Sequence, residues 1–545
     1  MNKPKSLRVT GFLLLTLLFM FAYGCSKGGS DSSDSSQDPC VNTGTPAVLG
    51  TGNSISLSGS IRYEDKAYDN SGFTGATIFR PVRFATVEVV RCSDSQVLSG
   101  AATDATGGYS LVFTNTGTAS VYLRVIADTG NAEIKNSTTD NAIYSVKSGR
   151  IDDSKGSSHT ANIDITVSSG AGGAFNILDV LTDGILYLKG LVVTNPPLLT
   201  AFWQTNSCDG TYFDSSDNSI HLLGGGSCPP DSFGDTDEYD DDIILHEFGH
   251  FVASSFSRDD SPGGSHTLGD NTEDIRLAWS EGWAHFLSSA IRGVSSQTDT
   301  VLSTASSFEI EGPSPLASST IYTTSEVSVA TVLWDIFDSA NEAFDGLSLN
   351  INPIWDVMNV YLPSAASVSI EDFWDGWFAR GHGSQTEMIN ISSDRKMELL
   401  SDGFETDDAP NPARKMAEGS TEHHTLYPAG DKDIVAFDVV LSQSYTIETL
   451  NLSNGADTLI EILRSDGVTL IESNDNSSNV TYVKNCVSGP PGPQECPLND
   501  NSTLSSRVSI IAPTTGTIFA RISRSLAAPD SAGIYGSYDL RITSP

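Results

Sequence analysis

One five-residue segment constrains this chain more than any other. Residues 246–250 read His-Glu-Phe-Gly-His, so two histidines stand four positions apart and a glutamate follows the first. A helix places positions i and i+4 one above the other, where two imidazoles reach one metal ion. We therefore predict a helix with His246 and His250 as zinc ligands. Glu247 then lies beside the metal, where it can act as general base toward a zinc-bound water.

A catalytic zinc ion needs a third protein ligand and an open position for water. Residues 277–287 read as a second helix, in which Glu281 is the one acidic group of an otherwise apolar stretch. A buried carboxylate is costly unless a cation or hydrogen bonds compensate it. The sequence therefore predicts Glu281 as the third zinc ligand, with a capping or salt-bridging glutamate as the alternative.

Residues 279–284, Trp-Ser-Glu-Gly-Trp-Ala, carry a family resemblance. They resemble the W-x-E-G-x-A motif of the gluzincin metallopeptidases, the thermolysin-like and fungalysin-like group, whose second helix supplies the last zinc ligand. The resemblance implies that role for Glu281. The chain departs from the pattern at His285, where many thermolysin-like members have an aspartate that orients a zinc histidine, so the groups that orient His246 and His250 are not predicted.

A weaker likeness concerns the group that stabilises the oxyanion. Residues 322–335 are similar to the segment that opens the next active-site helix of thermolysin-like enzymes, where a histidine has this role. The resemblance implies Tyr322, whose phenol can donate the hydrogen bond. His266, in the loop at residues 261–266, is the other candidate. A tyrosine that merely packs at a helix start remains the third interpretation.

The N-terminus has the pattern of an export signal. Residues 1–24 combine three basic residues with a short apolar run, and Ala22-Tyr23-Gly24-Cys25 resembles a bacterial lipobox. The resemblance implies a lipid on Cys25, residues 25–50 as a flexible tether, and a cell-envelope lipoprotein of the outer membrane or cell surface. Ordinary signal cleavage and secretion is the alternative.

Six further cysteines make an even number, which favours disulfides in an exported chain. Neighbours in sequence are the natural pairs, although sequence does not fix the connectivity. The expected bonds are Cys40–Cys92, Cys208–Cys228 and Cys486–Cys496.

The formal net charge of -38 argues against a nucleic-acid partner, because phosphate contacts need lysine and arginine. The acidic segment at residues 235–242 offers hard oxygen ligands for Ca²⁺, and a solvated acidic loop is the more ordinary interpretation. Zn²⁺ is the predicted cofactor, and Ca²⁺ is a second candidate.

Hydrophobic periodicity predicts a multidomain chain in which a mainly helical (α+β) domain, residues 171–412, lies between two all-β sandwiches. The motif resemblance at residues 279–284 implies that this helical domain is gluzincin-like. Residues 51–170 show short alternating runs, and Thr103–Leu111 resembles carboxypeptidase-regulatory-like domains. Residues 418–545 resemble the pre-peptidase C-terminal domain of secreted bacterial proteases. Helices are expected at 177–188, 327–337 and 370–378, and a strand at 218–223 that could pair with an extended peptide.

These observations predict an exported zinc-dependent endopeptidase that hydrolyses protein or peptide substrates and contacts a membrane through its lipid anchor. Two alternatives stay open. A surface binding or adhesion lipoprotein would keep a degenerate peptidase domain without turnover. An aminopeptidase would need a subsite for a free amine, and the sequence names no such group.

Overall fold

The computed structural model describes residues 40, 54–114, 120–152, 158–192, 195–225, 235–301, 304–311, 322–339, 343–404, 407–410, 414–476, 504–526 and 533–544. The chain divides into two compact units. The first comprises Met1–Ser255, Gly263–Ser265 and Leu287–Glu309, and the second comprises Phe256–Pro262, His266–Phe286 and Ile310–Pro545. The boundary falls within a single continuous helix, α3 (Ile275–Arg292), which contributes residues to both.

The N-terminal strands confirm the β structure expected from the alternating runs. The long strand β1 pairs with β5 and β9 along its first half and with β2 and β10 along its second, and β4-β3-β6-β8 form another sheet. Alternate residues of β1, among them Ile55, Leu57, Ile61 and Tyr63, are buried. The strands are β1 (Ser54–Asp69), β2 (Gly72–Pro81), β3 (Thr86–Arg91), β4 (Val97–Ala102), β5 (Gly108–Thr114), β6 (Val121–Ile126), β7 (Ala132–Lys135), β8 (Ser145–Lys147), β9 (Ser158–Thr160) and β10 (Ile163–Ile165).

A four-stranded sheet precedes the predicted metal helix. Its order is β12 (Tyr212–Asp214), β13 (Ser219–Leu222), β11 (Leu199–Trp203) and β7. The strand expected at 218–223 is therefore present as β13. It is paired with β11 on one side and β12 on the other, so the idea that it binds an extended peptide along its backbone is wrong. Strand β7 belongs to the N-terminal stretch of sequence and pairs in parallel with β11.

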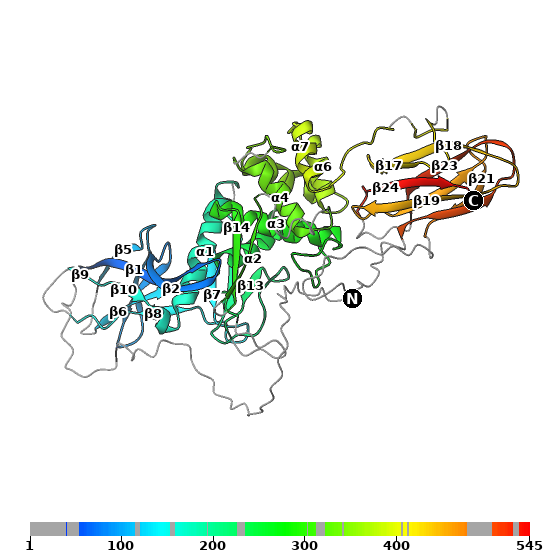
Figure 1. Ribbon diagram of the computed structural model, residues 1–545. Coiled ribbons are helices and arrows are strands. Elements are labelled where there is room, and N and C mark those ends of the chain that lie inside the picture. The colour runs from blue at the N-terminus through cyan, green and yellow to red at the C-terminus, as the bar shows by residue number, and fades with distance from the viewer. Residues whose placement is uncertain are drawn as a thin grey trace, which may run out of the picture. The chain divides into compact units, whose positions relative to one another are not determined.

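All seven α-helices of the described residues lie between residues 172 and 394, and 24% of the structure is helical. Three of them confirm the predicted helices at 177–188, 327–337 and 370–378. Figure 1 labels most of them. The helices are α1 (Gly172–Lys189), α2 (Asp241–Phe256), α3, α4 (Glu326–Phe337), α5 (Ile351–Asp356), α6 (Ile370–Ala379) and α7 (Gln385–Asp394), with short turns η1 (Val167–Ser169), η2 (Val357–Tyr361) and η3 (Leu362–Ser364).

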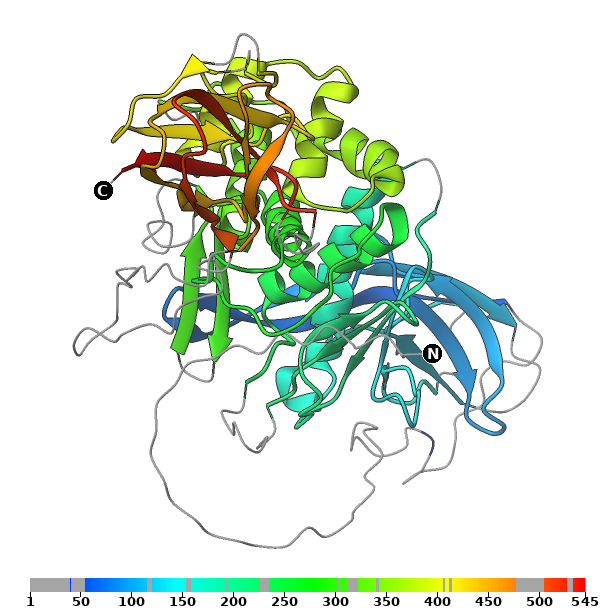
Figure 2. The same cartoon turned by 90° about the vertical axis from the view of Figure 1, so that its right-hand side faces the viewer.

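A hairpin follows α3. Strands β14 (Ser296–Val301) and β15 (Thr304–Glu309) run antiparallel and form the light green pair of arrows in Figure 2. Three residues of β14 are buried, and two of them, Thr298 and Thr300, contact the start of α2. The hairpin therefore helps to place the metal helix.

The C-terminal block forms two sheets around a common apolar core, which agrees with the expected β structure. One sheet has the order β16-β18-β23-β20-β21 and the other β17-β24-β19-β22. The strands are β16 (Arg414–Lys415), β17 (Thr421–Thr425), β18 (Lys432–Val439), β19 (Ser444–Ser453), β20 (Thr458–Leu463), β21 (Leu470–Asn474), β22 (Arg507–Ile511), β23 (Gly516–Arg524) and β24 (Ser537–Thr543).

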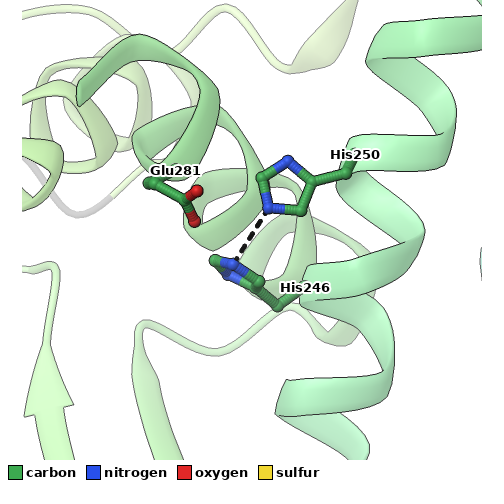
Figure 3. A group of neighbouring side chains, drawn as sticks. All are labelled: His246, His250 and Glu281. Carbon is green, nitrogen blue, oxygen red and sulfur yellow. Dashed lines mark hydrogen bonds between the residues drawn. The ribbon is translucent and has the colours of Figure 1, made fainter. Parts of the chain in front are cut away.

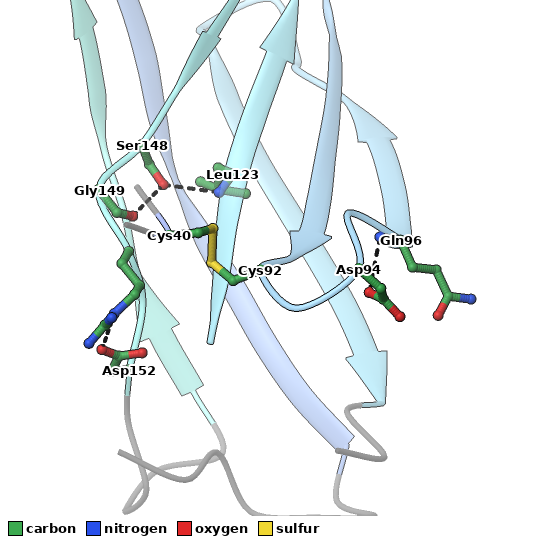
Figure 4. The surroundings of a disulfide bond; sticks show 9 residues. Cys40, Cys92, Asp94, Gln96, Leu123, Ser148, Gly149 and Asp152 are labelled. Carbon is green, nitrogen blue, oxygen red and sulfur yellow. Dashed lines mark hydrogen bonds and ion pairs between the residues drawn. A yellow bond between two sulfur atoms is a disulfide. The ribbon is translucent and has the colours of Figure 1, made fainter. Parts of the chain in front are cut away.

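One predicted disulfide is confirmed. Cys40 and Cys92 are bonded, with their Cα atoms 5.3 Å apart (Figure 4). Cys208 is disulfide-bonded as well. Its predicted partner Cys228, and the predicted pair Cys486–Cys496, lie outside the described residues.

Candidate metal centre

The helix that carries the histidine pair begins in buried acidic residues. Asp240 is 0% exposed, and its carboxylate accepts the backbone N–H of Thr300 at 2.9 Å and the Thr300 hydroxyl at 2.7 and 2.8 Å. Asp242 accepts the N–H of Thr298 at 3.0 Å and forms an ion pair with Arg292. The interpretation of these residues as a solvated loop is therefore wrong. They fasten the first turn of α2 to α3 and to the β14–β15 hairpin, and acidic groups suit a helix N-terminus.

The two imidazoles lie on one face of α2, as their spacing predicts. Their Nε2 atoms are 3.2 Å apart, and the two residues are 5% and 0% exposed. Two nitrogens that each bind a tetrahedral zinc ion at about 2.1 Å stand about 3.4 Å from one another. Glu281, which is 0% exposed, completes a group whose ligand atoms all lie within 4.8 Å of one another (Figure 3). The donor set His₂Glu and its spacing fit a zinc ion.

Glu281 stands in the buried middle of α3, between Trp279 and Trp283, which are 2% and 0% exposed. The next residue, Gly282, allows α4 to come close. A Cβ atom at this position would meet Cβ of Val329 at 2.5 Å and the carbonyl oxygen of Glu326 at 2.6 Å. The glycine of the Trp-Ser-Glu-Gly-Trp-Ala segment therefore has a packing reason, and α4 supports the turn that carries Glu281.

Glu247, the predicted general base, is 1% exposed on α2. His285 lies half-buried on α3, one turn after Glu281.

A second cluster joins Glu281 to residues that sequence reasoning did not combine. The His266 imidazole is 6% exposed, and its Nε2 lies 3.5 Å from a Glu281 oxygen and 3.6 Å from a Glu326 oxygen. Glu326 opens α4, and its backbone N–H donates to Glu273 at 3.2 Å. Burial and the nearby Glu326 raise the pKa of Glu273 to about 10. The sequence analysis did not predict that Glu273 and Glu326 belong to this cluster. For Glu326 the sequence did contain a signal, because it is an acidic residue in the first turn of the very apolar helix α4.

Tyr322 lies three residues before Ser325, which caps α4 through its side chain. Its φ is 107°, a value that is uncommon for a residue with a side chain, and its N–H donates to the carbonyl of Arg395 at 2.9 Å. A backbone held in this region marks a place where the surroundings impose the conformation. The catalytic role of Tyr322 remains a prediction.

Two more groups bring ligand-type atoms within 4.8 Å of one another. One consists of Asp235 and Asp237, from the acidic segment that predicts calcium binding, together with Asp299 of β14. The other lies in the C-terminal block, where the buried His424 imidazole contacts Asp433 at 3.1 Å and Asp402 at 3.3 Å. Burial lowers the pKa of His424, but the hydrogen bonds with the two aspartates outweigh burial and raise the pKa to about 9. That imidazole is therefore a charged partner of the carboxylates at neutral pH.

Comparisons with known proteins bear on the helical part of the chain. Residues 194–391 match the family model described as Mycolysin C-terminal domain. The matched stretch includes the histidine pair, Glu247 and Glu281. The chain therefore carries a peptidase-associated domain. The molecule is multidomain and rich in β-sheets.

More distant likenesses are limited to parts of the chain. An uncharacterized protein of Archaeoglobus fulgidus is 34% identical over 117 residues, which are 19% of this chain and 32% of that protein. The chain thus spans about a third of the length of this relative. The pre-peptidase C-terminal domain of a Bacillus anthracis collagenase is 13% identical, with 24% of this chain and 93% of that chain covered and a TM-score of 0.17. The periplasmic lysozyme inhibitor PliG of Aeromonas hydrophila is 8% identical, with 24% and 96% covered and a TM-score of 0.15. Scores this low carry no argument about function.

Some predictions fall outside the described residues. These are the signal peptide at 1–24, the lipidated Cys25 and the tether, apart from Cys40. Among the residues that the structure describes, no helix is long and apolar enough to cross a membrane.

Proposed function

We propose that this protein is an exported zinc-dependent endopeptidase in which His246, His250 and Glu281 hold the metal. The observation that carries the proposal is the convergence of three buried ligand atoms within 4.8 Å from residues 35 positions apart in sequence. The match of residues 194–391 to a family found in metallopeptidases supports it. The gluzincin type follows from the Trp-Ser-Glu-Gly-Trp-Ala resemblance.

The residues of the chain then divide the reaction between them. Zinc, when bound, supplies a Lewis acid that lowers the pKa of a water molecule and polarises the scissile carbonyl. Glu247 takes the proton of the attacking water and passes it to the departing amine. His266, whose ring lies beside Glu281, is our first candidate for donating a hydrogen bond to the oxyanion, and Tyr322 is the second.

Replacement of Glu247 by glutamine tests the proposal most directly. The side chain keeps its size but loses its basicity, so we expect kcat on a quenched peptide to fall by about 10²–10⁴-fold. Metal analysis should still find about one zinc per chain. Glu472→Gln makes the same chemical change at an exposed position of β21 and should leave kcat unchanged.

Each outcome separates the candidate functions. Equal activity of wild type and Glu247→Gln would show that the base is misassigned. A purified protein without bound zinc would rule out the zinc-dependent peptidase. Zinc without turnover in either protein would favour the binding or adhesion lipoprotein. Peptides with blocked N-termini distinguish the endopeptidase from an aminopeptidase, because only an endopeptidase cuts them.

The remaining parts of the proposal concern the other segments. Residues 51–170 are proposed as a carboxypeptidase-regulatory-like module and 418–545 as a pre-peptidase C-terminal module, with Cys25 as the lipid anchor that contacts the membrane. Protein or peptide is the proposed substrate, and the net charge of -38 argues against a nucleic-acid partner. Calcium at the acidic segment 235–242 stays a prediction, and we add Asp299 to the proposed ligands because its carboxylate lies close to those of Asp235 and Asp237. Metal analysis after mild chelation can check this site.

A further inference from the structure

Helix α6 presents a buried carboxylate to a loop of the C-terminal block. Glu371, in the first turn of α6, is 1% exposed. One oxygen accepts the backbone N–H of Ile534 at 2.6 Å and the other accepts that of Tyr535 at 3.2 Å. Gly533 completes the fit, because its φ is +70° and a Cβ atom there would lie 2.6 Å from Glu371 Oε1. Another residue at position 533 would therefore have a strained backbone and would crowd the Glu371 carboxylate.

Further side chains of α6 bind the same loop and its neighbour. Asp375, one turn after Glu371, accepts the Tyr535 hydroxyl with its two oxygens at 2.9 and 2.8 Å. Trp374 donates its indole N–H to the Tyr427 hydroxyl at 3.3 Å. The rings of Tyr427 and Tyr535 lie edge to face, with centroids 4.7 Å apart. We call Tyr427 and residues 533–535 the clasp.

A separate contact reaches the segment that opens α4. Thr323 follows the predicted oxyanion residue Tyr322, and its N–H points to the side-chain oxygen of Asn454 at 3.4 Å. Both Thr323 and Asn454 are buried, at 0% and 2% exposed. Asn454 lies just after β19 in the C-terminal block, with φ of +52°, a conformation that asparagine tolerates better than most residues. The C-terminal block thus contacts a segment next to Glu326 and the predicted active site.

We infer that the C-terminal β-sandwich is an integral part of the peptidase, held on α6 by the clasp and positioning the segment before α4 through Asn454. This inference rests on the proposed function for its catalytic part. Glu371 and Asn454 are positioning residues, because they act through the elements that they hold.

The physical reason is the cost of separating these surfaces. Hydrogen bonds to a charged or buried carboxylate are stronger than neutral ones, and a buried polar group that loses its partners is costly. Removal of the C-terminal block would leave Glu371, Asp375 and Trp374 without the partners named above. Burial raises the pKa of Glu371 to about 8, and the N–H groups of Ile534 and Tyr535 oppose that rise.

The test uses the full chain and two kinds of variant. Gly533→Ala and the milder Tyr535→Phe weaken the clasp, and we expect calorimetry to split one unfolding transition of the helical and C-terminal parts into two. Asn454→Gly removes the side-chain acceptor without backbone strain. We expect kcat to fall about 5-fold, the effect of one hydrogen bond, with KM within 2-fold.

Controls make the result specific. Asn454→Asp keeps an acceptor oxygen and should restore kcat. Asn451→Gly is the matched control, because Asn451 also has a positive φ in β19 but bonds to Asp539 within the C-terminal block. Unfolding and kcat that match wild type in Gly533→Ala and Asn454→Gly would overturn the inference. A wild type without peptidase activity would refute the proposed function instead, and the calorimetric comparison would then decide the clasp.

Discussion

The close approach of α3 and α4 at Gly282 gives a quantitative prediction. Gly282 directly follows the proposed zinc ligand Glu281, and an alanine at this position would bring its Cβ to 2.5 Å from Val329 Cβ and 2.6 Å from the Glu326 carbonyl oxygen. Ordinary contacts begin at 3.4 Å. One of these atoms belongs to the backbone of α4 and the other is attached directly to it, so neither can swing aside as the end of a flexible side chain could. Helices α3 and α4 must therefore move apart by about 1 Å.

Two opposing effects decide the free energy of unfolding of Gly282→Ala. Alanine gains about 1 kcal/mol of helix propensity over glycine. Overpacking of a close contact costs about 1–3 kcal/mol, and a rigid obstacle favours the upper end of that range. We therefore expect a net loss of about 2 kcal/mol. Activity should fall further, by up to about 100-fold in kcat/KM, because a displacement of about 1 Å at a catalytic group has that effect.

Urea unfolding and peptide hydrolysis measure the two quantities. Gly149→Ala is the control, because a Cβ at Gly149 meets nothing within 4 Å, and this variant should behave as wild type. A Gly282→Ala protein that is as stable as wild type, with kcat/KM within 2-fold, would refute the reasoning that α4 fixes Glu281.

Three further predictions follow from other contacts. Asp242→Ala leaves Arg292 without its carboxylate partner and should lower the free energy of unfolding in urea by about 3 kcal/mol. Breaking a buried ion pair costs about 3–5 kcal/mol, and the lower end applies because the Arg292 side chain is 27% exposed. A loss under 1 kcal/mol would contradict the proposed anchoring of α2. The pKa of His424 is raised to about 9 beside Asp402 and Asp433. Its contribution to the free energy of unfolding is therefore complete below the unfolded pKa of about 6.5 and is lost as pH rises through 9. The urea midpoint of the C-terminal block should be lower at pH 9.5 than at pH 6, and a flat or rising midpoint would count against this ion pair. Removal of zinc by a chelator should abolish hydrolysis and lower the melting temperature, and added Zn²⁺ should restore both. The melting temperature falls because a ligand present at 100 times its Kd stabilises the folded protein by about 2.7 kcal/mol. An enzyme that stays active in chelator would rule out the metal.

Local patterns in the sequence predicted much of the secondary structure. The helices at 177–188, 327–337 and 370–378 carry apolar residues at helical spacing, and serine caps begin α4 and α6. The strand at 218–223 was also correctly expected. Its pairing was not, because the strand's own residues do not encode which strands flank it. Strand β12 pairs with it as a local hairpin, and β11 pairs with it in parallel from earlier in the chain.

The same limit applies to the candidate site. The i, i+4 spacing suffices to place His246 and His250 together, and Glu281 stood out as a lone acid among apolar residues. His266 was a candidate from the loop between α2 and α3. Glu273 comes from the same loop and Glu326 from the start of α4, and no local pattern predicted that these two glutamates gather near Glu281. The acidic segment before α2 was misread for a related reason: its charges resemble a surface loop, whereas their partners Thr211, Thr298 and Thr300 lie far away in sequence.

The parallel pairing of β7 with β11 determines how this protein can be divided for experiments. A recombinant fragment that starts at residue 171 would omit β7 and leave the N–H and C=O groups of Leu199–Phe202 exposed along a bare strand. It would also lose Arg83, which forms ion pairs with Asp179 and Asp183 on α1. Bare strands recruit other chains, so such a fragment should aggregate, and soluble expression calls for a start before Ser54.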